Sequence, residues 1–313
     1  MKKIIKRTSL LVIVSALVMT ITGCGKSDRI IIGTQTSSEP KILASMYKLL
    51  IEDRTDLKVD VLPDLASSPV VISAMKKGEI QMATLYTGEI FNNYFPVKET
   101  KDRGEVLKQA QEGFKEHFNF KWFDPLGFEN TYAFTVRSEL AKENNLKTIS
   151  DVKNMASKMT LGVDTTWLER ENDGYPAFTK YYDIQFGQTL PMEIVLVYNA
   201  VASKKVDIVL AYSTDARLKE YNLQTLVDDK QFFPPYDASP VIKQEVLDAH
   251  PEIAEVIGEL IGKIDAETMI NLNYEVDVNK RNEKKVAEEY WYYPLMVDSK
   301  KRVHDIMDSL LLT

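Results

Sequence analysis

Short apolar runs alternate with amphipathic segments along the chain after its N-terminal segment. The runs at residues 30–33, 57–62 and 80–85 have the length and pattern of buried or half-buried strands. The SSEP sequence at residues 37–40 is typical of a helix start, and the apolar positions after it recur at helical spacing. Residues 69–77 form a second helical segment. This strand–helix–strand–helix–strand order predicts a mostly parallel α/β sheet.

The same alternation resumes in a second block, and a mainly helical tail follows the FFPP segment. The expected strands of the second block are residues 132–136, 159–163 and 206–212. One expected helix begins at Ser150-Asp151. Four others are expected at residues 192–203, 252–263, 266–276 and 283–292. Two α/β blocks with a helical tail predict two lobes joined by short crossovers, with a cleft between them. In open α/β sheets, ligands bind beyond the carboxyl ends of the strands, so the cleft is the expected site.

The N-terminal segment has the features of an export signal. A basic start, MKKIIKR, precedes an apolar run at residues 10–21 that is shorter than the roughly 20 residues of a membrane span. Cys24, the only cysteine, follows a small residue in an arrangement that resembles a bacterial lipoprotein box. We therefore expect a signal peptide at residues 1–23, a lipidated Cys24, a tether at residues 24–29, and anchoring to the extracytoplasmic face of the cell membrane. The alternative is an uncleaved anchor or a fortuitous cysteine.

The charge of the chain argues against nucleic acid as a partner. The 313 residues carry a formal net charge of −7, and the first 23 hold four basic residues and no acidic one, which leaves −11 for the rest. Phosphate binding needs clustered Lys and Arg, and the sequence has no such cluster outside its N-terminal segment.

Motifs of catalysis and cofactor binding are missing from the sequence. It contains no P-loop, no GxGxxG after a strand, no HExxH and no GxSxG. Three His and one Cys leave little for a zinc cluster or a disulfide framework. The sequence therefore predicts a protein that is not an enzyme and that uses no cofactor or metal.

Four tyrosines fall where expected strands end or loops begin: Tyr86, Tyr132, Tyr212 and Tyr236. Taken singly, each is most simply a core or rim tyrosine with a hydrogen-bonded hydroxyl. Together they favour an aromatic box for a quaternary ammonium group. Such a cation has no N–H to donate, so ring faces supply the attraction, at about 0.5–2 kcal/mol each.

Five segments carry a resemblance to a known family: IGTQTSSEPKILA, FENTYAFTVR, LGVDTTWLERENDGYPAF, LVYNAVASKKVDIVLAYSTDARL and FFPPYDASPVI. The chain resembles the lipoprotein substrate-binding subunits of ABC importers for glycine betaine, carnitine and choline. The resemblance implies a two-lobed periplasmic-binding-protein fold of type II, with one lobe at residues 30–130 plus 233–313 and the other at 131–232. It also implies that the four tyrosines surround the trimethylammonium group, and that the permease and its ATPase are separate subunits.

The resemblance also implies roles for further polar positions. Gln35, after the first strand, is expected to contact the ligand from the first lobe, and Asn130 to support the box from behind. Arg170 aligns with an arginine that binds a ligand carboxylate in some relatives; the alternative is a surface arginine paired with a neighbouring glutamate. Glu89 stands where many relatives have Thr. If Glu89 lines the pocket, it favours a cation without a carboxylate, such as choline, or accepts a hydrogen bond from a ligand hydroxyl. If it only begins a helix after Gly88, the usual preference for betaine and carnitine stands.

Three other functions compete with this interpretation. The same box could hold another betaine such as ergothioneine. An exported α/β enzyme acting on choline esters or phosphocholine would need a nucleophile or metal near the box, and the sequence offers no recognisable one. A structural or adhesive lipoprotein would leave the placement of the tyrosines unexplained.

Overall fold

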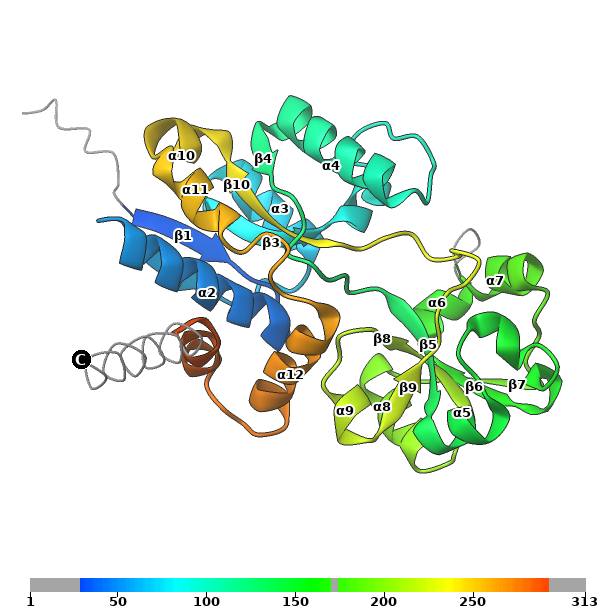
Figure 1. The fold of residues 1–313 in the computed structure, drawn as a ribbon. Coiled ribbons are helices and arrows are strands. Elements are labelled where there is room, and N and C mark those ends of the chain that lie inside the picture. The colour runs from blue at the N-terminus through cyan, green and yellow to red at the C-terminus, as the bar shows by residue number, and fades with distance from the viewer. Residues whose placement is uncertain (1–28, 170–173, 293–313) are drawn as a thin grey trace, which may run out of the picture.

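The computed structural model describes residues 29–169 and 174–292, and these residues form two five-stranded sheets in two lobes (Figure 1). The sheet of the first lobe has the order β2 (Lys58–Leu62), β1 (Arg29–Gly33), β3 (Met82–Tyr86), β10 (Ala238–Lys243), β4 (Phe120–Trp122). The sheet of the second lobe has the order β7 (Gln188–Pro191), β6 (Thr160–Val163), β8 (Ile208–Tyr212), β5 (Tyr132–Arg137), β9 (Leu223–Thr225). The predicted two-lobed α/β fold is confirmed.

Both sheets are mostly parallel, as predicted, and in each of them one strand runs against the other four. In the first lobe β1 runs parallel to β2 and β3, while β10 runs antiparallel to β3 and β4. The second lobe repeats this arrangement, with β6 parallel to its neighbours and β5 antiparallel. In each sheet the antiparallel strand follows a passage of the chain from the other lobe.

Strand β10 lies in the region that the sequence predicts to be mainly helical. Its Pro240 argues against a central strand, because proline has no N–H to donate to a neighbouring strand and is normally confined to sheet edges. The carbonyl of Pro240 accepts from the backbone N–H of Phe123, which lies just after β4. The side of β10 that lacks the donor therefore faces a loop instead of a strand, and the sheet loses no ladder bond there.

Helices pack around both sheets. The first lobe has α2 (Ser38–Arg54), α3 (Ser68–Lys77), α4 (Arg103–Phe118), α10 (Gln244–Ala249), α11 (Glu252–Gly258), α12 (Ala266–Asp277) and a helix at residues 283–292. The second lobe has α5 (Ser138–Asn144), α6 (Thr165–Glu169), α7 (Tyr175–Tyr182), α8 (Ile194–Ala202) and α9 (Arg217–Glu220). Short 3₁₀ helices are η1 (Thr87–Asn92), η2 (Ile149–Val152) and η3 (Ala156–Lys158). The helix expected from Ser150 is thus only η2, and the one expected at residues 252–263 ends at Gly258.

Helix α2 shows how the apolar pattern fixes the core. Ile42, Leu43, Met46 and Leu50 are fully or almost fully buried, as their helical spacing predicts. They belong to one hydrophobic cluster with β1, β2 and the helices after β10. Each side chain of this size contributes about 1.5–3 kcal/mol when it leaves water, so this face holds α2 against the sheet.

Two chain segments cross between the lobes and run side by side. Residues 128–131 lead into the second lobe, and residues 233–237 return from it (Figure 1). The backbone N–H of Asn130 donates to the carbonyl of Tyr236 at 3.0 Å, and a β-bridge joins the two segments.

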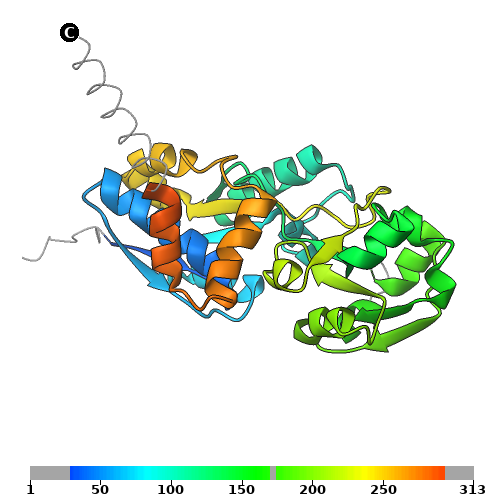
Figure 2. The same cartoon turned by 60° about the horizontal axis from the view of Figure 1, so that its bottom comes forward.

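Helix α12 makes a further connection between the lobes (Figure 2). It packs along α2 of the first lobe, and its Ile270 contacts the apolar cluster of α8 and β8 in the second. Lys219 of α9 donates to the side chain of Asn271 at 2.6 Å. The helix therefore lies against both lobes beside the crossovers.

Several sequence predictions fall on residues that the structure does not describe. The signal peptide, Cys24 and Arg170 lie outside the described ranges. Within those ranges, no helix has the length and apolar character needed to cross a membrane.

Candidate ligand-binding site

A cavity of about 360 Å³ lies where the two lobes and the crossovers meet. The first lobe contributes the N-terminus of α2 and the loops after β1 and β3, and the second lobe contributes the loop after β8. The lining residues are Gln35, Ser37, Ser38, Glu39, Pro40, Ser68, Tyr86, Glu89, Asn130, Tyr212, Thr214, Asp215, Tyr236, Asn273 and Asp277.

Three of the four predicted tyrosines line this cavity: Tyr86, Tyr212 and Tyr236. Tyr132 faces Tyr212 across the β5–β8 ladder, and the two rings stack at a centroid distance of 5.4 Å. Tyr132 also lies 6.0 Å from the ring of Phe233 and lines a neighbouring cavity. The four tyrosines are thus close together, with Tyr132 joined to the cavity through its stack on Tyr212. Their role as a cation box stays a prediction.

Gly88 leaves the space in which the Tyr236 ring lies. A Cβ at Gly88 would come within 2.4–2.6 Å of three ring atoms of Tyr236. No side chain larger than hydrogen fits at this position unless the ring moves.

We expect Gly88→Ala to displace the Tyr236 ring and to destabilise the protein by about 1–3 kcal/mol, the usual cost of overpacking. The double variant Gly88→Ala/Tyr236→Ala should recover much of that stability in thermal unfolding, because the clash is gone. Gly258→Ala is the matched control, since a Cβ there meets nothing within 4 Å. Additive losses in the double variant would contradict the contact.

Gln35 is 8% exposed, and its amide nitrogen donates to Ser68 Oγ at 3.2 Å and to the carbonyl of Thr84 at 3.4 Å. Its Oε1 is buried without a hydrogen-bond partner. Asn130 donates from Nδ2 to Glu39 at 3.1 Å, and its Oδ1 is likewise unpartnered. Each of these two cavity-lining side chains therefore has an amide oxygen that accepts no hydrogen bond. The sequence predicts polar contacts from both residues.

Glu89 lines the cavity and is 6% exposed. It lies in the first turn of η1, which begins at Thr87, so the helix that the sequence places after Gly88 is a short 3₁₀ helix. Asn92 Nδ2 donates to its carboxylate at 2.8 Å. Burial raises the pKa of Glu89, against the lowering effect of its hydrogen bonds with Ser68 and Asn92.

Glu39 is the residue that sequence reasoning missed. It is 3% exposed, lies in the first turn of α2, and accepts from the hydroxyl of Tyr86 at 2.7 Å. Burial raises its pKa, while hydrogen bonds with Thr214, Tyr86, Asn130 and Asn273 lower it. In the sequence its SSEP context indicates only a helix start, because an acidic residue there suits the helix dipole.

The charges around the cavity have one sign. Among the described lining residues, four are acidic, namely Glu39, Glu89, Asp215 and Asp277, and none is Lys or Arg. A cavity with several carboxylates and three tyrosine rings is suited chemically to a cation.

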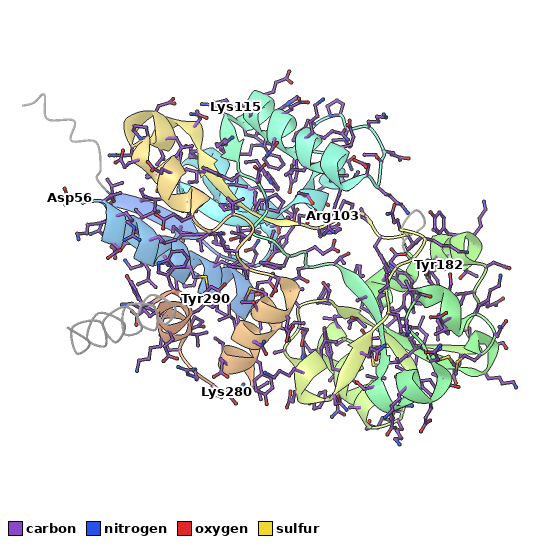
Figure 3. All side chains as sticks on the ribbon, in the orientation of Figure 1. Asp56, Arg103, Lys115, Tyr182, Lys280 and Tyr290 are labelled. Carbon is purple, nitrogen blue, oxygen red and sulfur yellow. The ribbon has the colours of Figure 1, made fainter. Side chains whose placement is uncertain are left out.

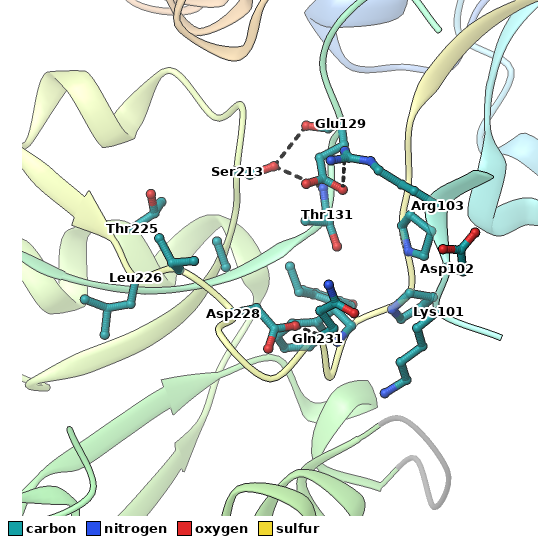
Figure 4. Close-up of a pocket in the computed structure, with 16 residues that line it drawn as sticks. Lys101, Asp102, Arg103, Glu129, Thr131, Ser213, Thr225, Leu226, Asp228 and Gln231 are labelled. Atoms are coloured by element: carbon teal, nitrogen blue, oxygen red, sulfur yellow. Dashed lines mark hydrogen bonds and ion pairs between the residues drawn. The ribbon is translucent and has the colours of Figure 1, made fainter. Parts of the chain in front are cut away.

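A second cavity, of about 510 Å³, adjoins the crossovers (Figure 4). Arg103, which projects toward the crossovers in Figure 3, binds Asp237 through Nε and a terminal nitrogen and reaches Glu129 at 3.0 Å. Ser213 Oγ donates to the carbonyl of Glu129 and accepts from the N–H of Thr131. The Arg103 contacts join the two crossover segments, and the Ser213 contacts join the first crossover to the loop after β8, so the second cavity lies beside these connections.

Comparison with known proteins identifies the family. A sequence profile for the substrate binding domain of ABC-type glycine betaine transport systems matches residues 28–292. The chain belongs to this family. It is 43% identical over 295 residues to the carnitine transport binding protein OpuCC of Listeria monocytogenes, covering 92% of this chain and 96% of that protein.

Two further comparisons bear on the site. The crystal structure of a glycine betaine/carnitine/choline ABC transporter protein superposes with a TM-score of 0.80 and 39% identity, covering 83% of this chain and 97% of that one. The ergothioneine transport permease/ergothioneine binding protein EgtU of Helicobacter pylori is 30% identical over 90% of this chain and 50% of that protein. The resemblance stated from the sequence is confirmed, and the family consists of transport binding proteins and not of enzymes.

Proposed function

We propose that this protein is an extracytoplasmic solute-binding lipoprotein that captures a quaternary ammonium osmoprotectant and delivers it to an ABC permease. Glycine betaine, carnitine and choline are the candidate ligands. The observation that carries the proposal is the cavity between the lobes, which combines tyrosine rings with buried carboxylates and, among its described residues, no basic side chain. The names of the matched relatives support the same ligand class.

In this proposal the lobes comprise residues 30–130 plus 233–313 and residues 131–232, and they close on the ligand about the crossovers. Closure would bring Tyr86 and Tyr236 toward Tyr212 and exclude water, which strengthens cation–π attraction in a site of low dielectric constant. Gln35 and Asn130 would supply polar contacts, and Tyr132 would support the box through its stack on Tyr212.

Ligand identity depends on the charges at the cavity. Glu89 favours a cation without a carboxylate, whereas the similarity to a carnitine transport binding protein favours carnitine. Arg170 would be the basic group that offsets a ligand carboxylate. Ergothioneine is the weaker alternative, since the ergothioneine-binding relative is the more distant of the two.

The proposal is tested by calorimetric titration of the protein with choline, carnitine, glycine betaine and ergothioneine. We expect saturable binding of at least one of the first three ligands. Hydrolysis assays on choline esters and phosphocholine, run alongside, should show no turnover. Failure of all four ligands to bind, or turnover of an ester, would contradict the proposed function.

We expect Cys24→Ala to release the protein from the membrane or to leave it as an uncleaved precursor, because the acylated cysteine is the proposed anchor. Fractionation and intact-mass analysis of the wild type and the variant measure this. Wild-type protein that retains Met1 and carries no acyl chains would contradict the anchor, while leaving the binding proposal in place.

A further inference from the structure

Glu39 is an almost fully buried carboxylate at the ligand cavity without a basic partner among the described residues. The groups that hydrogen-bond it are two hydroxyls and two side-chain amides, none of which carries a positive charge. Burial raises the pKa of Glu39, and these four hydrogen bonds, which lower that pKa, are what stabilises the charged form of its carboxylate.

The hydrogen bonds of Glu39 come from every part of the molecule that meets at the cavity. Tyr86 of the first lobe donates to Oε1 at 2.7 Å, and Asn130 of the crossover donates to the same oxygen at 3.1 Å. Asn273 of α12 approaches Oε2 at 3.4 Å and also donates to the carbonyl of Thr214 in the second lobe at 2.9 Å. Because these partners present donors, the geometry suits the ionised carboxylate, which can only accept.

The other acidic side chains at the cavity are less able to act as a fixed counter-charge. Asp215 is neutralised by a two-pronged ion pair with Arg217, at 2.6 and 2.8 Å. Asp277 is exposed to solvent, which screens its charge. Glu89 is the one other buried carboxylate among the described lining residues, and Glu39 differs from it by bonding directly to a tyrosine of the predicted box.

The bond between Tyr86 and Glu39 has a consequence for the tyrosine ring. A phenol that donates to a carboxylate is polarised toward phenolate, which makes its ring face more negative and more attractive to a cation. The same bond fixes the position of the hydroxyl and so the orientation of the ring at the cavity.

We propose that Glu39 is a specificity-determining residue that selects a positively charged trimethylammonium head over a neutral head of the same shape. It acts as the fixed counter-charge behind Tyr86 and as the residue that orients that ring. This inference rests on the proposed function, because it assumes that a quaternary ammonium compound occupies the cavity.

The test compares choline with 3,3-dimethylbutan-1-ol, its uncharged carbon isostere, on wild type, Glu39→Gln and Glu39→Asp. We expect Glu39→Gln to weaken choline binding at least about tenfold and to change binding of the isostere by less than about twofold, because the lost attraction is to charge. Glu39→Asp keeps the charge and should keep the preference for choline. Equal losses of affinity for both ligands in Glu39→Gln, or no loss for either, would overturn the inference. A merely structural role would change the two affinities by the same factor.

Glu89→Gln provides a second test that does not require the Glu39 variants to fold. With Glu39 intact, most of the preference for choline over the isostere should remain in Glu89→Gln. If that variant binds the two ligands equally, Glu39 supplies no selection and the inference fails. A wild type that binds none of choline, carnitine and glycine betaine contradicts the proposed function instead, which keeps the two failures distinct.

Discussion

Replacing any one of the four tyrosines with alanine should weaken binding of the preferred quaternary ammonium ligand by roughly 1–3 kcal/mol, or about five- to 150-fold. The four variants are Tyr86→Ala, Tyr132→Ala, Tyr212→Ala and Tyr236→Ala. Each variant loses one ring face opposite the cation, or the stack that supports one, together with its packing. Calorimetric titration of the four variants measures the loss. Replacement by phenylalanine should cost less wherever the ring and not the hydroxyl makes the contact.

Tyr181→Ala is the matched control for these variants. Tyr181 is 48% exposed in the second lobe and is not among the residues that line the cavity between the lobes. Its loss should leave the affinity unchanged. If one of the four cavity-region variants binds as tightly as this control, that tyrosine does not belong to the box.

The apolar pattern of the sequence predicted most of the helices and strands, because apolar positions recur about every 3.6 residues in a helix and about every second residue in a half-buried strand. The strands at residues 30–33 and 132–136, and the apolar face of α2, lie where their patterns place them. Strand β10 was missed because Pro240 normally argues against a central strand, and only the loop beside it makes that proline tolerable. Local pattern cannot predict such a case, since the partner of Pro240 lies more than a hundred residues away in the sequence.

The same limit applies to the site. The position of the four tyrosines at strand ends or loop starts predicted that they share a site, and three of them line one cavity. The placement of Tyr132 behind Tyr212 depends on which rings meet across the β5–β8 ladder, which strand position alone does not fix. Glu39 was missed for a stronger reason. Its donors Tyr86 and Asn273 are 47 and 234 residues distant, so before folding it has only the signature of a helix start.

Glu89→Thr should change the ligand ranking in favour of the zwitterions. Glu89 is buried at the cavity, and two carboxylates about 4 Å apart repel by about 4 kcal/mol at an effective dielectric constant of about 20. An ionised Glu89 should therefore depress binding of glycine betaine and carnitine relative to choline. Threonine removes the repulsion and adds a hydroxyl donor for the ligand carboxylate, so both zwitterions should gain at least about tenfold while choline weakens slightly.

Titration of wild type and Glu89→Thr with all three ligands measures this change in ranking. Glu112→Thr is the control for a general effect of removing an acid, because Glu112 is 67% exposed on α4 and does not line the cavity. The burial that raises the pKa of Glu89 gives a further check, since protonation at acidic pH removes the same repulsion. Zwitterion binding by the wild type should therefore strengthen relative to choline as the pH falls, and Glu89→Thr should lose that dependence. An unchanged ranking in Glu89→Thr would mean that Glu89 serves only the first turn of η1, where its carboxylate accepts from Asn92.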